Sequence, residues 1–341
     1  MSDALLEARR LSRHFVVHTG HGLIRPKKTV RAVDDVSLSL HADRVTAVVG
    51  ESGSGKSVLA RMLARIVTPT SGELLLAGER IPVKTPRSLA YASEVQLVLQ
   101  DPFASINPVH KVRHSLERPL LIHGTARGEL ESRASAALSR VSLEPPERYL
   151  DRYPHELSGG QLQRVSIARA LCVNPQVLLA DEPISMLDVS VRLGVLNLLR
   201  GLCDNEKLAV LYITHDIASA RYIADETIVM YAGQVVERSD GTALIDGPMH
   251  PYTQLLIASV PDPGDPLRRA PEIEDRADQG QFPAEGCRFA PRCPHAMDVC
   301  RTSAPPLFGV ATGHESRCWL HESATKVSIN GREQGRDIST T

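Results

Sequence analysis

Eight consecutive residues combine glycines, hydroxyl side chains and one lysine in an order that suits a phosphate group. The stretch is Gly50-Glu51-Ser52-Gly53-Ser54-Gly55-Lys56-Ser57 and follows the apolar run 45–49. In the pattern G-x-x-x-x-G-K-S, glycines let backbone N–H groups converge on phosphate oxygens, the lysine reaches the β- and γ-phosphates, and the last hydroxyl can ligate Mg²⁺. A helix expected over 58–66 adds the positive end of its dipole. The stretch, a P-loop, therefore predicts nucleotide binding.

Two carboxylates, Asp181 and Glu182, follow a second apolar run at 177–180. Hydrolysis of a bound nucleotide needs a further Mg²⁺ contact and a residue that orients water. Side chains at the carboxyl end of a parallel strand face the ligand crevice of an open α/β sheet. This position favours Asp181 as a Mg²⁺ ligand and Glu182 as the general base. A helix-starting turn is the alternative, which the presence of the P-loop disfavours.

Strand-like and helix-like segments alternate along most of the chain. Strands are expected at 33–40, 45–49, 73–77, 95–99, 177–180 and 209–214, with a hairpin at 227–236. Apolar residues recur at helical spacing between 112 and 148, which predicts a mainly helical insert. Alternating strands and helices imply an α/β fold around a mostly parallel, doubly wound sheet.

Composition narrows the class of protein. The 341 residues carry 39 basic and 40 acidic side chains, so overall charge gives no argument for nucleic acid as a partner. The first residues lack the features of a signal peptide, and no apolar run approaches roughly 18 residues. We therefore expect a cytoplasmic chain without a membrane span of its own.

The turn Leu157-Ser158-Gly159-Gly160-Gln161, taken with the P-loop and Asp181-Glu182, resembles the ATPase subunit of ATP-binding-cassette (ABC) transporters. The resemblance implies a P-loop NTPase fold, with a RecA-like core and antiparallel β and α-helical subdomains, over residues 1–247. The helical subdomain would span about 101–165. In this family Ser158, Gly159, Gly160 and Gln161 complete the ATP site of a facing subunit, so that two cassettes enclose two ATP molecules.

The same resemblance implies roles for further residues. Gln100 matches the glutamine that contacts Mg²⁺ and water, and His215 matches the histidine that contacts the γ-phosphate. Asp188 belongs to the segment called the D-loop in the family. Phe15 matches the aromatic residue that stacks on adenine, although it could equally be a core residue. The implied ATP site comprises Phe15, Gly50, Ser52, Gly53, Ser54, Gly55, Lys56, Ser57, Gln100, Asp181, Glu182, Asp188 and His215.

Within the family, residues 98–108, His250-Pro251-Tyr252-Thr253 and the cysteine-rich C-terminal stretch resemble the importers of dipeptides and oligopeptides. This resemblance implies a second, preferably different, ATPase subunit, two transmembrane permeases, an indirect link to an extracytoplasmic substrate-binding protein, and no nucleic acid. The location would be peripheral, on the cytoplasmic face of the inner membrane. The alternatives are an importer of nickel or another small solute, and a soluble cassette ATPase acting on ribosomes or DNA. The single cassette disfavours the soluble ATPase, because such proteins usually carry two.

Four cysteines crowd the C-terminal part of the chain: Cys287, Cys293, Cys300 and Cys318. In a reducing compartment, clustered thiols more often indicate a metal than a disulfide. Four thiolates can hold Zn²⁺ or a 4Fe–4S cluster. Some members of the peptide-importer subfamily carry such a cluster at these cysteines, which favours 4Fe–4S over Zn²⁺, free thiols or a disulfide. We expect a linker over 248–286, a metal-binding extension over 287–320 and a disordered tail over 321–341.

Overall fold

Apolar runs form the parallel strands of a central eight-stranded sheet in the computed structural model, which describes residues 4–18, 27–82, 87–259 and 285–322. The strand order is β11-β12-β10-β9-β3-β8-β7-β6. Every residue of β3, β7 and β8 is buried, as expected for parallel strands covered on both faces. The parallel strands are β3 (Val45–Val49), β6 (Val95–Val98), β7 (Val177–Asp181), β8 (Ala209–Thr214) and β9 (Glu226–Tyr231).

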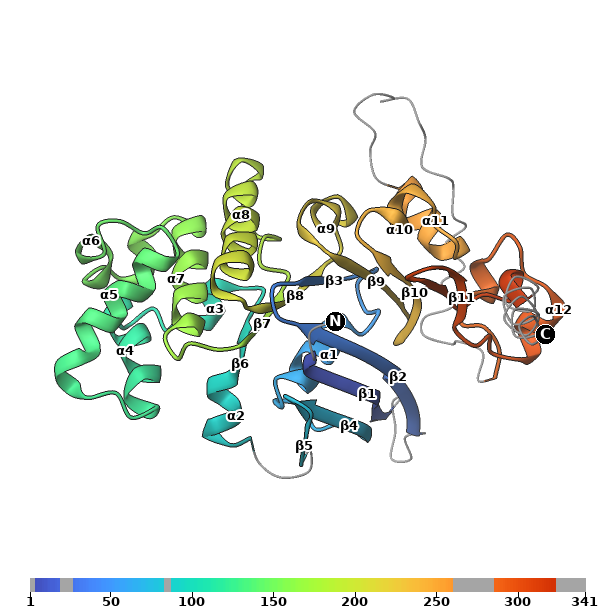
Figure 1. Cartoon of the computed structure of the whole chain (residues 1–341), viewed down its shortest axis with the longest axis horizontal. Coiled ribbons are helices and arrows are strands. Elements are labelled where there is room, and N and C mark those ends of the chain that lie inside the picture. Colours follow the sequence, from blue (N-terminus) through green and yellow to red (C-terminus); the bar gives the residue numbers. More distant parts are fainter. Residues whose placement is uncertain (1–3, 19–26, 83–86, 260–284, 323–341) are drawn as a thin grey trace, which may run out of the picture.

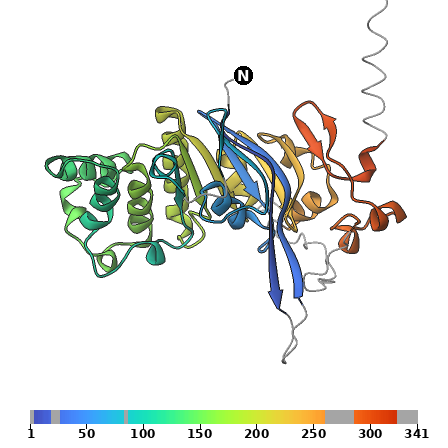
Figure 2. The same ribbon diagram turned by 90° about the horizontal axis from the view of Figure 1, so that it is seen from below.

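Antiparallel strands extend this sheet beyond β9. They are β10 (Gln234–Asp240), β12 (His314–Ser316) and β11 (Phe308–Ala311). A separate antiparallel sheet, in the order β2-β1-β4-β5, forms the expected β subdomain. Its first two strands make a long hairpin that projects from the body (Figure 2). These strands are β1 (Ala4–His18), β2 (Lys27–His41), β4 (Ser71–Leu76) and β5 (Glu79–Ile81).

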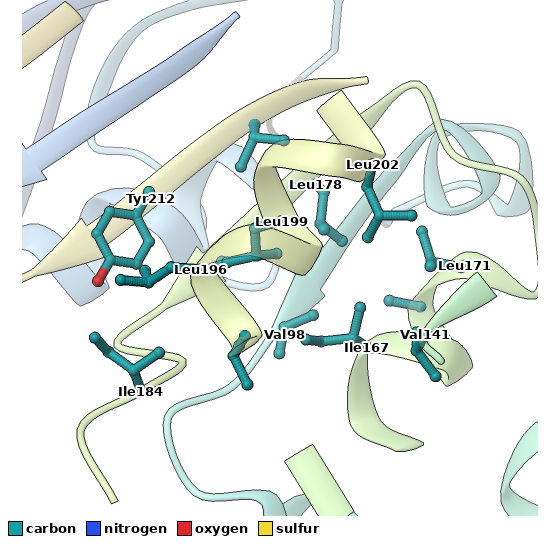
Figure 3. Close-up of a cluster of buried hydrophobic side chains, with 14 of the residues drawn as sticks. Val98, Val141, Ile167, Leu171, Leu178, Ile184, Leu196, Leu199, Leu202 and Tyr212 are labelled. Carbon is teal, nitrogen blue, oxygen red and sulfur yellow. The ribbon is translucent and has the colours of Figure 1, made fainter. Parts of the chain in front are cut away.

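Two apolar clusters cover the two faces of the central sheet. One contains side chains of α1 (Lys56–Leu63) and of the antiparallel sheet. The other contains side chains of α7 (Gly159–Leu171), α8 (Val189–Glu206) and α9 (Ile217–Ile223). In Figure 3, leucines of α8 pack toward Leu178 of β7 and Ile167 of α7. The helices α1 and α7 therefore lie on opposite faces of the sheet.

The expected helical insert forms a subdomain at one end of the molecule, on the left in Figure 1. It contains α3 (Pro102–Ser105), α4 (Val112–Ile122), α5 (Leu130–Arg140), α6 (Glu147–Leu150) and the short 3-10 helices η1 (Arg127–Glu129) and η2 (Pro154–Glu156). The remaining helices are α2 (Leu89–Glu94), α10 (Ala243–Asp246), α11 (Pro251–Ala258), α12 (Asp298–Thr302), η3 (Ala290–Arg292) and η4 (Trp319–His321). None of the helices in the described ranges is long and apolar enough to span a membrane.

The C-terminal residues differ from the expected division at 247. The HPYT segment, assigned above to a linker, begins helix α11, and Tyr252 there is only 1% exposed. Strand β12 pairs with β10, so the extension continues the central sheet. The physical reason is the buried Glu237, which accepts hydrogen bonds from the backbone of Met249 and His250 and pairs with His314. The expected linker over 260–284 and the tail over 323–341 lie outside the described residues.

Candidate nucleotide site

The P-loop leaves β3 and enters α1 in a conformation that only glycine tolerates at two positions. Gly50 has φ +153° and Gly55 has φ +104°. A Cβ atom on Gly50 would lie 2.2 Å from the carbonyl oxygen of Met230, and one on Gly55 would lie 2.2 Å from that of Ala32. No side chain caps the start of α1, so its first N–H groups face the loop. The loop therefore has the backbone geometry of an anion cradle.

Lys56 is the buried cation of the site. Its Nζ donates to the carbonyl oxygens of Gly50 at 2.7 Å and Glu51 at 2.9 Å. Burial lowers the pKa of Lys56, while the nearby carboxylates of Glu182, Asp181 and Glu51 act in the opposite direction. The ammonium group is thus held inside the loop, where the phosphates of a nucleotide would lie.

Ser57 and Asp181 meet although 124 positions separate them in the chain. The Ser57 hydroxyl donates to Asp181 Oδ1 at 2.9 Å. Burial raises the pKa of Asp181, and the bond from Ser57 opposes this shift. A carboxylate and a hydroxyl oxygen side by side form a donor set that suits Mg²⁺, which prefers oxygen ligands.

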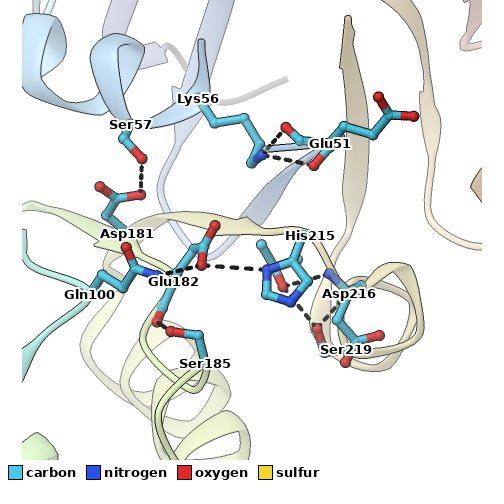
Figure 4. A network of polar contacts seen from close by, with 12 residues as sticks. Glu51, Lys56, Ser57, Gln100, Asp181, Glu182, Ser185, His215, Asp216 and Ser219 are labelled. Carbon is cyan, nitrogen blue, oxygen red and sulfur yellow. Dashed lines mark hydrogen bonds and ion pairs between the residues drawn. The ribbon is translucent and has the colours of Figure 1, made fainter. Parts of the chain in front are cut away.

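Glu182 lies at the centre of the polar network in Figure 4. Its carboxylate accepts a hydrogen bond from Gln100 Nε2 at 2.8 Å and lies 3.4 Å from His215 Nδ1. These residues follow β6, β7 and β8, three adjacent parallel strands. Glu182 has φ +47°, and its N–H donates to the Ile213 carbonyl at 2.9 Å. A non-glycine residue in this region carries strain that is typical of functional sites.

The turn at Ser158 stands apart from the P-loop. Ser158 caps α7, accepting from Gln161 N–H at 3.3 Å, while its own N–H donates to Gln161 Oε1 at 3.0 Å. It is exposed, and α7 packs on the face of the sheet opposite to α1. Asp188, at the start of α8, is also exposed. The glycine at 160 is required because a Cβ there would lie 2.4 Å from a methyl of Val191.

Phe15 lies half-buried on the hairpin, opposite Val30. The guanidinium of Arg13 lies over its ring, 4.6 Å from the centroid. The ring is therefore supported on one side by a cation. Its role in binding adenine stays a prediction.

The C-terminal extension, which from here on means residues 248–259 and 285–322, contacts the P-loop. The Tyr252 hydroxyl accepts a hydrogen bond from the Glu51 N–H at 2.9 Å. The guanidinium of Arg292 binds both carboxylate oxygens of Glu51, each at 3.0 Å. The sequence shows an acidic residue, Glu51, inside the P-loop and the HPYT motif at 250–253. No pattern in the sequence indicates that these two segments are in contact.

All four C-terminal cysteines line one pocket, together with His250, Phe289 and Trp319. All four are free thiols. Burial raises the pKa of Cys287 and Cys293, and that of Cys318 to about 11. Over the ranges that the structure describes, no group of three or more His, Cys, Asp or Glu side chains is arranged to hold a metal ion. The four cysteines predicted to bind a metal therefore line the same pocket, but their side chains are not arranged as a metal site.

Cys172 and Cys203 are buried and behave as small apolar side chains. Cys203 lies within α8, and Cys172 follows the last residue of α7. Burial raises the pKa of each thiol to about 12. Both therefore belong to the apolar core.

Known proteins match both parts of the chain. A family described as ABC transporter matches residues 33–185, and one described as oligopeptide/dipeptide transporter, C-terminal region, matches residues 236–300. A probable peptide ABC transporter ATP-binding protein of Sinorhizobium fredii is 40% identical over 97% of this chain and 94% of its own length. A di/tripeptide transport ATP-binding protein of Pseudomonas aeruginosa is 41% identical over 89% and 94%.

The fold has a counterpart among solved structures. A dimeric ATP-binding cassette in a post-hydrolysis state, bound to ADP and phosphate, aligns with a TM-score of 0.59 and 27% sequence identity. The alignment covers 69% of this chain and 98% of that cassette. The C-terminal extension is thus an addition to a cassette fold.

Proposed function

Because this chain belongs to the ATP-binding proteins of peptide ABC transporters, we propose that it hydrolyses ATP to drive the import of dipeptides or oligopeptides. The observation that carries the proposal is the convergence of Lys56, Ser57, Asp181 and Glu182 at one edge of the sheet. The resemblance stated from the sequence is confirmed, and so is the reading as a peptide-transport ATPase.

The geometry supports a different role in ATP hydrolysis for each residue of the site. Lys56 and the loop N–H groups would bind the phosphates, while Ser57 and Asp181 would hold Mg²⁺, which neutralises phosphate charge when bound. Glu182 would orient the attacking water and accept its proton as the water oxygen bonds to the γ-phosphorus. The bond from that phosphorus to the oxygen shared with the β-phosphate would break, which releases ADP and phosphate. Gln100 and His215, both in contact with Glu182, hold that carboxylate in place.

A second ATPase subunit would complete the site. Ser158 is exposed and its helix lies on the face opposite to α1, so its hydroxyl is suited to a nucleotide bound by another chain. Met186, Val189 and Leu193 are large apolar side chains exposed beside it, at 57%, 79% and 49%. We propose that these residues face a second cassette, preferably a different subunit.

The permeases would bind near the helical subdomain. Phe103 and Val109, exposed at 54% and 70%, follow Gln100 directly in the chain. Apolar side chains at this position would link a transmembrane subunit to the glutamine that contacts Glu182. We therefore propose that the chain lies at the cytoplasmic face of the membrane, and that a substrate-binding protein acts on it only through the permeases.

A mild-detergent pull-down of the tagged protein from its native membrane tests this function. We expect two permeases and a second ATPase subunit to copurify, and the complex to hydrolyse ATP. The substrate-binding protein that works with the copurified permeases is then assayed with peptides and with nickel. The solute that it binds identifies the cargo of the importer. Ribosomal or DNA-bound partners without permeases would instead support a soluble ATPase.

For the cysteine pocket we propose a 4Fe–4S cluster held by Cys287, Cys293, Cys300 and Cys318, with Zn²⁺ as the alternative. The donor chemistry fits, because four thiols line one pocket and would bind as thiolates. Burial raises the pKa of the Cys287 and Cys293 thiols, so binding of the metal as thiolates would release protons and would draw the side chains together. The group would supply folding free energy to the extension.

The variant Cys293→Ser tests the cysteine pocket. We expect protein purified without oxygen to lose its bound metal, because one of four ligands is replaced, while ATP binding at the P-loop persists. Iron, sulfide and zinc content are measured alongside the absorption spectrum. Cys203→Ser, in the core of α8, serves as the matched control and should retain the metal. A metal-replete Cys293→Ser protein would exclude that residue as a ligand.

A further inference from the structure

Glu51 is held through its carbonyl oxygen, its N–H and its carboxylate, and two of its four hydrogen-bonding partners come from the C-terminal extension. Its carbonyl oxygen accepts from Lys56 Nζ at 2.9 Å and from the Ser54 N–H at 3.2 Å, both within the loop. Its N–H donates to the Tyr252 hydroxyl at 2.9 Å, and its carboxylate binds the Arg292 guanidinium through two hydrogen bonds of 3.0 Å. In Figure 4 this carboxylate points away from Lys56. The extension thus holds the second residue of the P-loop by backbone and side chain together.

The partners of Glu51 are themselves rigidly placed. The side chain of Arg292 is only 13% exposed, and its guanidinium lies 5.7 Å from the ring centroid of Tyr231 and 5.9 Å from that of Phe289. Phe289 packs edge-on against both Tyr231 and Tyr252, at centroid distances of 5.3 and 5.6 Å. A planar guanidinium held in this way is pre-organised for bidentate binding of a carboxylate.

The position of Glu51 matters for the nucleotide in two ways. Its carbonyl oxygen holds Lys56 Nζ, so a shift of Glu51 displaces the ammonium that reaches the phosphates. Its carboxylate is also a negative charge beside a site that binds a polyanion, and Arg292 neutralises it. Loss of Arg292 would therefore loosen the loop and leave a repulsive charge near the phosphates.

We propose that Arg292 is a positioning residue for ATP, which fixes and neutralises Glu51 from the C-terminal extension. The inference rests on the proposed ATPase function. It gives the extension a direct role at the nucleotide site, separate from any ligand of the cysteine pocket. Arg292 lies next to Cys293, in the turn that η3 forms, so the two features share one structural unit.

The test is ATP affinity and turnover in the full-length chain. We expect Arg292→Ala to raise KM and the dissociation constant of a fluorescent ATP analogue about tenfold, with kcat within about threefold, since the pair makes charge-assisted hydrogen bonds outside the reacting atoms. Arg292→Lys keeps the positive charge but lacks the planar guanidinium that binds both carboxylate oxygens. Its affinity for ATP should therefore lie between those of Arg292→Ala and the wild-type protein. Tyr252→Phe, which removes only the hydroxyl, should have a smaller effect of the same sign.

A double variant separates this role from general damage. Glu51→Gln removes the same interaction and also the negative charge that Arg292→Ala leaves unpaired, so adding it to Arg292→Ala should raise KM no further and should lower it in part. If the KM increases of the two single variants multiply in the double variant, the proposal is overturned. Arg238→Ala is the matched control, since it breaks an ion pair between β10 and β12 without touching the P-loop. An equal rise of KM in this control would also overturn it.

Failure of the Arg292 proposal can be distinguished from failure of the proposed ATPase function. A wild-type chain that neither binds nor hydrolyses ATP, assayed in its complex, would refute the ATPase function. A normal wild-type chain with an unchanged KM in Arg292→Ala would refute only the role of Arg292.

Discussion

Replacing Glu182 by Gln is expected to lower the rate of ATP hydrolysis by about 10²–10⁴-fold, the range that a positioned general base contributes. The amide keeps the size of the side chain and a carbonyl oxygen that can accept from Gln100, but it cannot take a proton from water. Lys56, Ser57 and Asp181 are untouched, so ATP binding should persist. ATP would then hold two cassettes together, because the step that releases them is blocked.

The measurement combines single-turnover hydrolysis with size-exclusion chromatography in the presence of Mg²⁺ and ATP. Mixed with its second ATPase subunit, the Glu182→Gln protein should elute as a dimer with ATP, and the corresponding wild-type mixture should return to the smaller forms as ATP is consumed. Glu156→Gln, in η2 of the helical subdomain, provides a control for the loss of one carboxylate. Turnover near the wild-type rate in Glu182→Gln would show that another group is the base.

Lys56→Ala is expected to weaken ATP binding by about 10²-fold or more, because a buried charged partner of the phosphates is removed. Hydrolysis at moderate ATP concentration should be lost with it. The effect on folding should be small, because two contributions oppose each other. Removing the ammonium group removes a charge that burial disfavours, but it also removes the hydrogen bonds to the Gly50 and Glu51 carbonyl oxygens.

Equilibrium titration with ATP and a thermal melt distinguish these two effects. A lower melting temperature together with weak binding would indicate a collapsed loop instead of a missing phosphate contact. Lys111→Ala, whose partner Asp151 lies on the surface of the helical subdomain, is the matched control and should bind ATP normally. Retained affinity in Lys56→Ala would contradict the assignment of Lys56.

Much of the nucleotide site follows from the sequence because its residues stand at the ends of apolar strands. Parallel strands place their carboxyl ends at one edge, so Asp181 and Glu182 were predictable neighbours of the P-loop once the strands were identified. Gln100 and His215 followed only from the family resemblance. The glycines of the loop were also fixed locally, since Gly50 and Gly55 adopt backbone angles that other residues avoid. These features depend on short-range pattern and on sheet topology.

The limits of the sequence lie in contacts between distant segments. The clustered cysteines predicted a separate metal-binding extension after a linker, whereas β12 joins the central sheet through β10, and Tyr252 of α11 contacts the P-loop. Pairing of an edge strand depends on which backbone is left unpaired in the folded sheet, and no local pattern states this. The left-handed conformation of Glu182 is likewise imposed by its bond to Ile213.

The sequence alone thus determined the P-loop, the carboxylates that lie beside it and the family, because each depends on residue types at fixed spacing along the chain. Only the tertiary structure decided that Ser158 lies on the face of the sheet away from α1, and that Arg292 reaches Glu51 across 241 positions. Such contacts arise from the packing of whole layers, in which the free energy of burial is shared among many side chains and is not encoded at any one of them.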